Sequence, residues 1–371
     1  MRSESDNEDQ PKIPLSTQDA LKLMSSFLDK EWAQTDISAV RIRMITGGLI
    51  NTLQLIERNN IAVLEPSAVL IRHFGRSGKL EEPTGGSLTL SSGQQAVVYS
   101  EMARRGWGPK VFGLFHGGRL EEYLDAHTLT AAESLQADIA RDVARSYARL
   151  HSLRLPLRRD NFEVVIRDLN EAVQAKSRQI VGTLLEVEDP VATEYAGMFG
   201  SLDWSRELKW ISELFQRHNC KLTVTHGDAN YLNILVKNLG SESRVALIDY
   251  ETVSYSHRGI DIGGHFHERM YCYDQPDSQL SGFEAPNRDE QTLFCEAYLQ
   301  EMRDLGDELS EHDTIDHLIL EAEIGRLCHI LVTNLMCTVH DEVEIEPLFL
   351  SGLLHSMRTY EHLKREFLST H

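Results

Sequence analysis

A short stretch near the middle of the chain combines residue types that can hold a metal ion and activate a hydroxyl group. His226, Asp228 and Asn233 form the pattern H-x-D-x-x-x-x-N within THGDANYLN. Asp249 follows sixteen residues later at the end of an apolar segment, with Glu251 two positions on. Carboxylate and amide oxygens are the ligands that a hard cation such as Mg²⁺ prefers. One further carboxylate can then face an attacking alcohol.

This spacing is that of the catalytic loop of kinases, in which an aspartate orients the substrate hydroxyl and an asparagine five residues later holds Mg²⁺. The alternative is a turn-rich loop in which aspartate and asparagine only cap neighbouring elements. Apolar segments at 222–224, 233–236 and 245–249 surround the loop and predict short strands. Because the motif lies between these strands and ends at a strand-end aspartate, the kinase interpretation is favoured.

The elements expected around this loop change in character along the chain. Ser16 is a candidate N-cap for a first helix. Short alternating or apolar segments then predict five strands, and a helix through Ala96–Ala103 interrupts them. These strands are RIRMI (41–45), TLQLIER (52–58), AVLIRHF (68–74), KVFGLF (110–115) and RLEEYL (119–124). Helical spacing dominates afterwards, at 130–153, 162–180 and 203–218. The sequence therefore predicts an α+β chain with a disordered tail (1–15), a small antiparallel-sheet lobe (16–124) and a larger, mostly helical lobe (125–371).

Four segments resemble the choline/ethanolamine kinase family, which shares the fold of aminoglycoside phosphotransferases and protein kinases. They are GGLINTL (47–53), VLIRHFG (69–75), GWGPKVFGLFHGGRLEEYL (106–124) and IDYETVSYSHRGIDIGGHFHERMYCY (248–273). The resemblance implies a two-lobed, protein-kinase-like fold. It also implies ATP- and Mg²⁺-dependent transfer of the γ-phosphate to the hydroxyl of choline or ethanolamine, a step in phospholipid biosynthesis.

The resemblance also implies roles for individual residues. Asp228 would be the catalytic base, Asn233 and Asp249 would bind Mg²⁺, and Glu251 would lie beside the metal ions and the substrate hydroxyl. In the acceptor pocket, Glu268 would face the cationic nitrogen of the substrate and Tyr273 would line the same pocket. The implied nucleotide contacts are Gly47, Gly48 and Asn51 over the phosphates, Arg72 on the phosphates, and Glu121, Glu122 and Leu124 beside the adenine. The supporting residues are His226 and Asp261, which would brace the catalytic loop, and Gln95.

The chain departs from the family pattern at its cation pocket and in its small lobe. Two tryptophans are expected in a late helix, where aromatic faces would attract a quaternary ammonium, but the aligned residues are Leu335 and Thr338. Thr252 stands where a tyrosine is expected and Arg269 where a tryptophan is expected. In the small lobe, Gln95 stands where a helix glutamate should pair with Arg72. Gln95 can accept a hydrogen bond from a guanidinium but carries no charge.

Composition restricts the partners that the protein can have. The 37 basic and 57 acidic residues give a formal charge of −20, which argues against nucleic acid and anionic membrane surfaces. No apolar run approaches the ~20 residues that a bilayer crossing needs. Five cysteines form no CxxC pair, which favours a reducing, cytoplasmic location. Small molecules are the expected partners, namely ATP and an amino alcohol, and related enzymes suggest a homodimer.

Three functions are compatible with these observations. The first is an active choline or ethanolamine kinase, and the intact set Asp228, Asn233 and Asp249 favours it. The second is a catalytically weakened regulatory member of the family, which Gln95 and the lost tryptophans would suit. The third keeps the kinase activity but changes the acceptor to another small amino alcohol or an aminoglycoside. A zinc site at His265, His267 and Glu268 is disfavoured because the segment lacks the i,i+4 histidine pair of H-E-x-x-H.

Overall fold

The structure is a computed structural model, and it divides the chain into two compact units. One comprises residues 1–83 and 91–125, and the other comprises residues 84–90 and 126–371. The residues that the structure describes are 14–28, 30–45, 52–59, 64–74, 89–238, 244–273, 278–339 and 347–371. Residues 1–13 of the expected tail lie outside this set. Leu15 lies within it, and its backbone N–H donates to Gln54 Oε1 at 3.0 Å.

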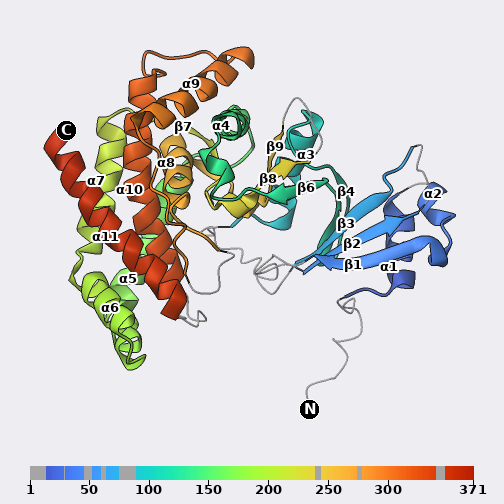
Figure 1. The fold of residues 1–371 in the computed structure, drawn as a ribbon, viewed down its shortest axis with the longest axis horizontal. Coiled ribbons are helices and arrows are strands. Elements are labelled where there is room, and N and C mark those ends of the chain that lie inside the picture. Colours follow the sequence, from blue (N-terminus) through green and yellow to red (C-terminus); the bar gives the residue numbers. More distant parts are fainter. Residues whose placement is uncertain are drawn as a thin grey trace. The chain divides into compact units, whose positions relative to one another are not determined.

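The smaller unit contains a five-stranded antiparallel sheet with the strand order β1-β2-β3-β5-β4 (Figure 1). Alternation of buried and exposed positions is typical of strands with two different faces. The elements of this unit are α1 (Thr17–Phe27), α2 (Lys30–Ala33), η1 (Ile37–Ala39), β1 (Val40–Ile45), β2 (Thr52–Arg58), β3 (Ala68–His73), α3 (Ser92–Arg104), β4 (Val111–Phe115) and β5 (Gly118–Glu122).

The two faces of this sheet are covered by different helices. One face packs Ile71 and Leu120 against Met24 of α1 and forms an apolar cluster. Neighbouring residues of a strand point to opposite faces, so Arg72 and Arg119 lie on the other face. There Arg119 contacts side chains of α3. The expected N-cap at Ser16 is confirmed, since its hydroxyl oxygen accepts the backbone N–H of Asp19.

Short strands and long helices make up the larger unit. The strands form two small sheets, β10-β7 and β6-β8-β9, and all their pairs are antiparallel. The strands are β6 (Ala126–Thr128), β7 (Leu222–Thr225), β8 (Ile234–Lys237), β9 (Val245–Leu247) and β10 (Ser254–His257). These strands carry the loops of the candidate site.

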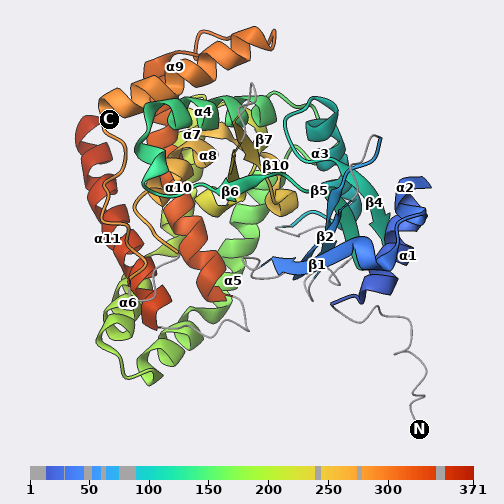
Figure 2. The ribbon, with the colours of Figure 1, turned by 45° about the vertical axis from the view of Figure 1, so that its right-hand side comes forward.

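Several long helices of this unit pack against α10 (Ile315–Val339). Figure 2 shows α11 (Pro347–Thr370) running beside it. The remaining elements are η3 (Glu133–Leu135), α4 (Ala137–His151), α5 (Asn161–Glu186), α6 (Pro190–Ser201), α7 (Trp204–Arg217), η4 (Tyr231–Asn233), η5 (Tyr250–Thr252), α8 (Arg258–Glu268) and α9 (Arg288–Asp304). The antiparallel-sheet part and the helical part predicted from the sequence are thus confirmed.

Glycines allow α8 and α10 to approach each other closely. A Cβ atom at Gly259 or Gly263 of α8 would lie 2.0 or 2.1 Å from a carbonyl oxygen of α10, that of Glu321 or Ala322. A Cβ atom at Gly325 of α10 would lie 1.8 Å from the carbonyl oxygen of Gly259. The backbones are therefore in direct contact, and α10 fixes the position of α8. None of the helices in the described part of the chain has the length and hydropathy that a bilayer crossing requires.

Candidate functional site

Strand β7 leads into the H-x-D loop, and a buried carboxylate holds the beginning of this loop. Asp261 is fully buried on α8 and accepts the backbone N–H of His226 at 2.6 Å and that of Gly227 at 3.0 Å. His151 Nε2 lies 3.0 Å from the same carboxylate. Burial alone would raise the pKa of Asp261, but the hydrogen bond and charge of His151 and the loop N–H groups hold this pKa below its usual value. The charged Asp261 therefore braces the loop.

Gly227 is required by the path of the loop. Its φ of +83° lies in the left-handed region, and a Cβ atom there would come within 2.6 Å of the carbonyl oxygen of Thr252. Thr252 also donates its hydroxyl to the carbonyl oxygen of His226 at 2.8 Å. His226 Nε2 lies 2.8 Å from the carbonyl oxygen of Ile248. The loop is thus tied to the segment that follows β9, and His226 has a positioning contact.

Asp228 is exposed, and hydrogen bonds orient its carboxylate. Oδ2 accepts from Asn233 Nδ2 at 2.8 Å, and Oδ1 accepts the backbone N–H of Asn230 at 3.2 Å. Asn230 in turn caps η4, because its side chain accepts the backbone N–H of Leu232. This one-turn helix places Asn233 beside Asp228, although the two residues are five positions apart in the chain. A carboxylate oriented in this way can accept a proton from a hydroxyl group.

Asp249 is brought next to Asn233 by the pairing of β8 with β9. The backbone N–H of Ile248 donates to the carbonyl oxygen of Asn233 at 2.9 Å, so Asp249 is one residue from this contact. Asp249 has φ 65° and ψ 66°, a left-handed conformation that costs a non-glycine residue about 1–2 kcal/mol. Strain of this kind concentrates at functional sites. The Nδ2 of Asn233 is used by Asp228, which leaves its amide oxygen as a neutral ligand beside a carboxylate, a donor set that fits Mg²⁺.

Glu251 lies on η5 directly after Asp249, and its backbone oxygen accepts the N–H of Leu90 at 2.6 Å. The structure therefore brings together Asp228, Asn233 and Asp249 in the larger unit, with Glu251 on the adjoining turn. Within the described residues, no three His, Cys, Asp or Glu side chains are arranged to hold a metal ion. Asn233 and Asp249 would not make up such a group, because they are only two side chains and one of them is an amide.

A second polar cluster surrounds Glu268 at the end of α8. The hydroxyl of Tyr273 donates to Glu268 Oε2 at 2.7 Å, and His329 Nε2 of α10 lies 3.3 Å from Oε1. The backbone N–H of Tyr273 donates to the hydroxyl of Tyr231, which belongs to η4, and the two rings are 5.4 Å apart. Burial and the nearby charge of Glu268 raise the pKa of Tyr273 well above its usual value, so its hydroxyl stays protonated. The predicted residues Glu268 and Tyr273 are therefore in direct contact.

Arg269, Leu335 and Thr338 stand where the family pattern has tryptophans, and each of them has contacts within the larger unit. Arg269 forms an ion pair with Glu290 at 2.7 Å and donates to the backbone of Glu284. Leu335 is fully buried in the helical core. Thr338 is buried, and its hydroxyl donates to the backbone oxygen of Asn334 at 2.7 Å. These side chains stabilise packing or hydrogen bonding and supply no aromatic face.

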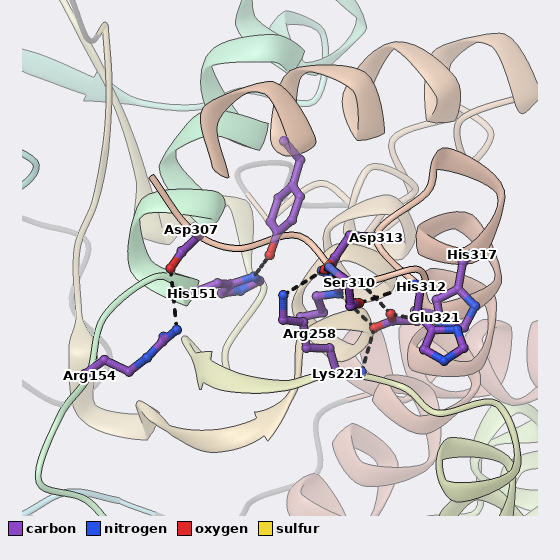
Figure 3. Close-up of polar contacts among 11 residues, drawn as sticks. His151, Arg154, Lys221, Arg258, Asp307, Ser310, His312, Asp313, His317 and Glu321 are labelled. Atoms are coloured by element: carbon purple, nitrogen blue, oxygen red, sulfur yellow. Dashed lines mark hydrogen bonds and ion pairs between the residues drawn. The ribbon is translucent and has the colours of Figure 1, made fainter. Parts of the chain in front are cut away.

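A buried ion network fixes the beginning of α8. Arg258 is fully buried and donates to Asp313 at 2.5 Å and to both carboxylate oxygens of Glu321, at 3.0 and 2.7 Å (Figure 3). Lys221, just before β7, donates to Asp313 at 3.0 Å. Charge-assisted bonds of this kind are short and directional. Because Arg258 is three residues before Asp261, this network also orients the helix turn that braces the H-x-D loop.

The nucleotide residues predicted in the smaller unit form their own ion network. Arg72 Nε donates to Glu121 Oε1 at 2.7 Å, and Arg119 Nε donates to the same oxygen at 2.5 Å. Gln95 accepts from Arg119 Nη1 at 2.9 Å. Burial alone would raise the pKa of Glu121, but the charges of both arginines outweigh this effect and lower it. A helix glutamate was expected to pair with Arg72, but Gln95 stands at its position. Glu121, from the neighbouring strand, supplies the negative charge beside Arg72 instead.

The other predicted nucleotide residues have fewer visible contacts. Glu122 accepts the backbone N–H of Lys110 at 3.1 Å, and Leu124 follows the end of β5. Gly47, Gly48 and Asn51 lie outside the described residues. Several residues of the site were missed by the sequence analysis: His151, which lies between Asp261 and Tyr298, and Tyr231 and His329 beside Glu268. Only Tyr231 carries a local signal, since it lies inside the motif loop.

A two-part chain with an H-x-D-x-x-x-x-N loop and a strand-end aspartate defines the class of small-molecule phosphotransferases with a protein-kinase-like fold. The choline kinase of Cryptosporidium parvum has this fold, with a TM-score of 0.67 and 20% sequence identity, over 95% of this chain and 97% of that one. The family model "Choline/ethanolamine kinase" matches residues 42–345. The chain therefore belongs to the choline/ethanolamine kinase family.

Curated relatives agree with this assignment. Choline kinase A2 of Caenorhabditis elegans is 26% identical over 324 residues, which cover 79% of this chain and 72% of that protein. Choline kinase alpha of Mus musculus is 27% identical over 342 residues, which cover 85% of this chain and 73% of that protein. The similarity extends over both units of the chain. As a member of this family of small-molecule kinases, the protein uses ATP as a co-substrate.

Proposed function

We propose that the protein transfers the γ-phosphate of ATP, with Mg²⁺, to the hydroxyl of ethanolamine or choline. The observation that carries this proposal is the hydrogen-bonded pair of Asp228 and Asn233, with Asp249 one residue from the backbone contact of Asn233. A degenerate member of the family would be expected to lose these polar groups, since they serve the reaction and not the packing of the core. Their arrangement supports an active enzyme.

In the proposed reaction Asp228 accepts the proton of the substrate hydroxyl as the hydroxyl oxygen attacks the γ-phosphorus, and the bond from that phosphorus to the bridging oxygen of the β-phosphate breaks to release ADP. Asn233 and Asp249 would hold Mg²⁺, with Glu251 as a further carboxylate nearby. When bound, the metal ion would neutralise charge on the phosphate oxygens. Asn233 would have two tasks, because its amide nitrogen orients Asp228 while its amide oxygen is left for the metal ion. His226 and Asp261 would keep the loop in its reactive shape.

The acceptor would bind with its cationic nitrogen near Glu268. The carboxylate is buried to 6% exposure, and Tyr273, with 37% of its surface exposed, contributes an accessible ring beside it. A primary ammonium can donate hydrogen bonds to a carboxylate, whereas a quaternary ammonium depends on aromatic faces. Because leucine and threonine replace the two expected tryptophans, the site favours ethanolamine over choline.

In the smaller unit we propose that the nucleotide contacts Arg72 through its phosphates and the region of Glu121, Glu122 and Leu124 through its adenine. The ion pair with Glu121 would keep the guanidinium of Arg72 at a constant position on β3. Gln95 would act through Arg119. Gly47, Gly48 and Asn51 are proposed for the loop over the phosphates, as the family resemblance implies.

We also propose a cytoplasmic homodimer. None of the five cysteines, all of them described residues, forms a disulfide, which suits a reducing compartment. Size-exclusion chromatography with light scattering would test the dimer: a single species of one chain at micromolar concentration would contradict it. Fractionation of cells that produce the tag-free protein would test the location. The protein should be found in the cytoplasmic fraction.

The decisive experiment measures ADP release by the purified protein with Mg²⁺-ATP and a panel of acceptors. The panel should contain ethanolamine, its methylated forms, choline, an aminoglycoside and no acceptor. Asp228→Ala should abolish release, and Asp304→Ala, at an exposed aspartate of α9, should leave it unchanged. Absence of turnover with every amino alcohol, or turnover unaffected by Asp228→Ala, would refute the proposal. Nucleotide binding without turnover would instead favour a regulatory member of the family, and turnover with the aminoglycoside alone would favour the third function.

A further inference from the structure

His329 lies deep in α10 and contacts the proposed acceptor carboxylate. Its side chain is 10% exposed, and its Nε2 lies 3.3 Å from Oε1 of Glu268. On its other side, the ring packs on the backbone of α8, where a Cβ at Gly264 would come within 2.9 Å of Nδ1. The same Cβ would come within 2.7 Å of Ala229, the residue that follows Asp228. His329 is thus packed below the catalytic loop and beside the acceptor pocket.

Both oxygens of Glu268 have a partner, but the two partners differ in kind. Tyr273 donates to Oε2 through a hydroxyl that stays protonated, because burial and the charge of Glu268 raise the pKa of Tyr273. The partner of Oε1 is an imidazole, which changes its charge between about pH 5 and pH 8 in ordinary surroundings. Each carboxylate oxygen has two lone pairs, so an ammonium N–H can still approach Glu268 while both contacts persist.

We propose that His329 is a positioning residue that sets how strongly Glu268 attracts the cationic end of the acceptor. This inference rests on the proposed function. Neutral His329 donates its Nε2–H to Oε1 and orients a carboxylate with a full negative charge. Protonated His329 forms an ion pair with Glu268 and cancels that charge at the place where the acceptor cation must bind.

Other ionisable groups surround this pair, and none of them replaces its effect. His267 of α8 has its ring 5.8 Å from that of His329, and burial, Arg326 and the other histidines lower the pKa of His267. It therefore stays neutral over the relevant range. Arg326 donates toward His267 Nδ1 at 3.5 Å and to the sulfur of Met270. Further neighbours in the cluster are Tyr271, Tyr273 and, on α11, His355. Cys337 and Tyr147 also lie near enough that burial and the charge of Glu268 raise their pKa values, so both stay neutral.

The direction of the pH effect follows from the charges. The ammonium of ethanolamine resembles that of lysine, whose pKa is about 10, so the acceptor remains a cation from pH 6 to pH 8. Protonation of His329 would raise the net charge near the acceptor by one unit and would weaken acceptor binding. The KM for the acceptor should therefore rise at low pH, while the KM for ATP should not follow it.

The test compares the KM for ethanolamine at about pH 6 and pH 8 in three versions of the full-length protein. The unmodified protein should show a rise of roughly five- to tenfold at the lower pH. His329→Gln keeps a hydrogen-bond donor but cannot titrate, so its KM should change by less than about twofold. His329→Leu loses the donor, and its KM should be raised at both pH values. In all three proteins kcat should stay within about threefold, since Asp228 is untouched.

His362→Gln is the matched control, because His362 is an exposed histidine of α11 paired with Glu366. It should retain the pH profile of the unmodified protein. The inference is overturned if His329→Gln phosphorylates ethanolamine with the unmodified profile, or if the KM for ATP shows the same dependence. If the unmodified protein phosphorylates no amino alcohol at either pH, the proposed function itself fails and the inference falls with it. The two failures are therefore distinguishable.

Discussion

The carboxylate of Asp261 accepts the backbone N–H of His226 at 2.6 Å, although 35 positions separate the two residues. The contact joins the first turn of α8 to the beginning of the catalytic loop. Arg258 anchors the same turn through Asp313 and Glu321. The beginning of the H-x-D loop is therefore held by a helix that follows it in the chain and packs tightly against α10.

The first prediction concerns the proposed catalytic base. Asp228→Asn preserves the size of the side chain but removes its ability to take a proton, so kcat should fall by about 10²- to 10⁴-fold. Since Asp228 is exposed, the melting temperature should change little. Coupled-assay ADP release and thermal unfolding measure the two quantities. A kcat within threefold of the unmodified value would exclude Asp228 as the base.

A second prediction concerns the path of the loop. Gly227→Ala places a Cβ 2.6 Å from the oxygen of Thr252 at a φ of +83°, so we expect a loss of about 2 kcal/mol in the free energy of unfolding and a large loss of activity. Gly182→Ala is the matched control, because Gly182 lies within α5 with open space around its Cβ position. This control should gain up to about 1 kcal/mol. Equal effects of the two changes in urea unfolding would contradict the argument.

A third prediction concerns the ion network of the smaller unit. Glu121→Gln leaves the buried guanidiniums of Arg72 and Arg119 without the carboxylate between them. Unfolding free energy should fall by about 3 kcal/mol, and the KM for ATP should rise because Arg72 loses its partner. Glu101→Gln disrupts exposed pairs with Arg104 and Arg105 and should cost less than about 1 kcal/mol. A KM for ATP that is unchanged in a folded Glu121→Gln protein would remove Arg72 from the nucleotide site.

The fourth prediction is loss of stability in acid. Burial alone would raise the pKa values of Asp313, Glu321 and Asp261. Neighbouring positive charges and hydrogen bonds outweigh burial and lower these pKa values in the folded protein. Unfolded carboxyls titrate near pH 4, so the stabilisation is fully present above about pH 5 and is lost as the pH falls toward the lower folded values. Urea midpoints at about pH 7 and pH 4 measure the loss. The Asp313→Asn protein should be less stable than the unmodified protein at pH 7, and its urea midpoint should fall less between pH 7 and pH 4. An equal fall of the midpoint in both proteins would exclude Asp313 as a contributor.

Local patterns were sufficient to predict most of the elements that carry the site. Alternating residues predicted the strands of the small sheet, and the motif spacing predicted the order β7, loop, β8, β9. The helices α2, α6, α8, α9 and α11 and the strands β6 and β10 were not predicted. Strands β6 and β10 are three and four residues long, too short for a periodic signal, and are defined by their pairing with β8 and β7.

The sequence by itself determined the chemistry, because Asp228, Asn233 and Asp249 lie within 22 positions and their spacing depends only on a loop and two short strands. Tertiary structure decided which residues support that chemistry. It placed Glu121 beside Arg72, where the linear alignment pointed to Gln95, and it placed His329 of α10 against Glu268 of α8. The physical reason is that such pairs are set by the register of neighbouring strands and the close approach of two glycine-containing helices. Neither the register nor the approach is a property of any single segment.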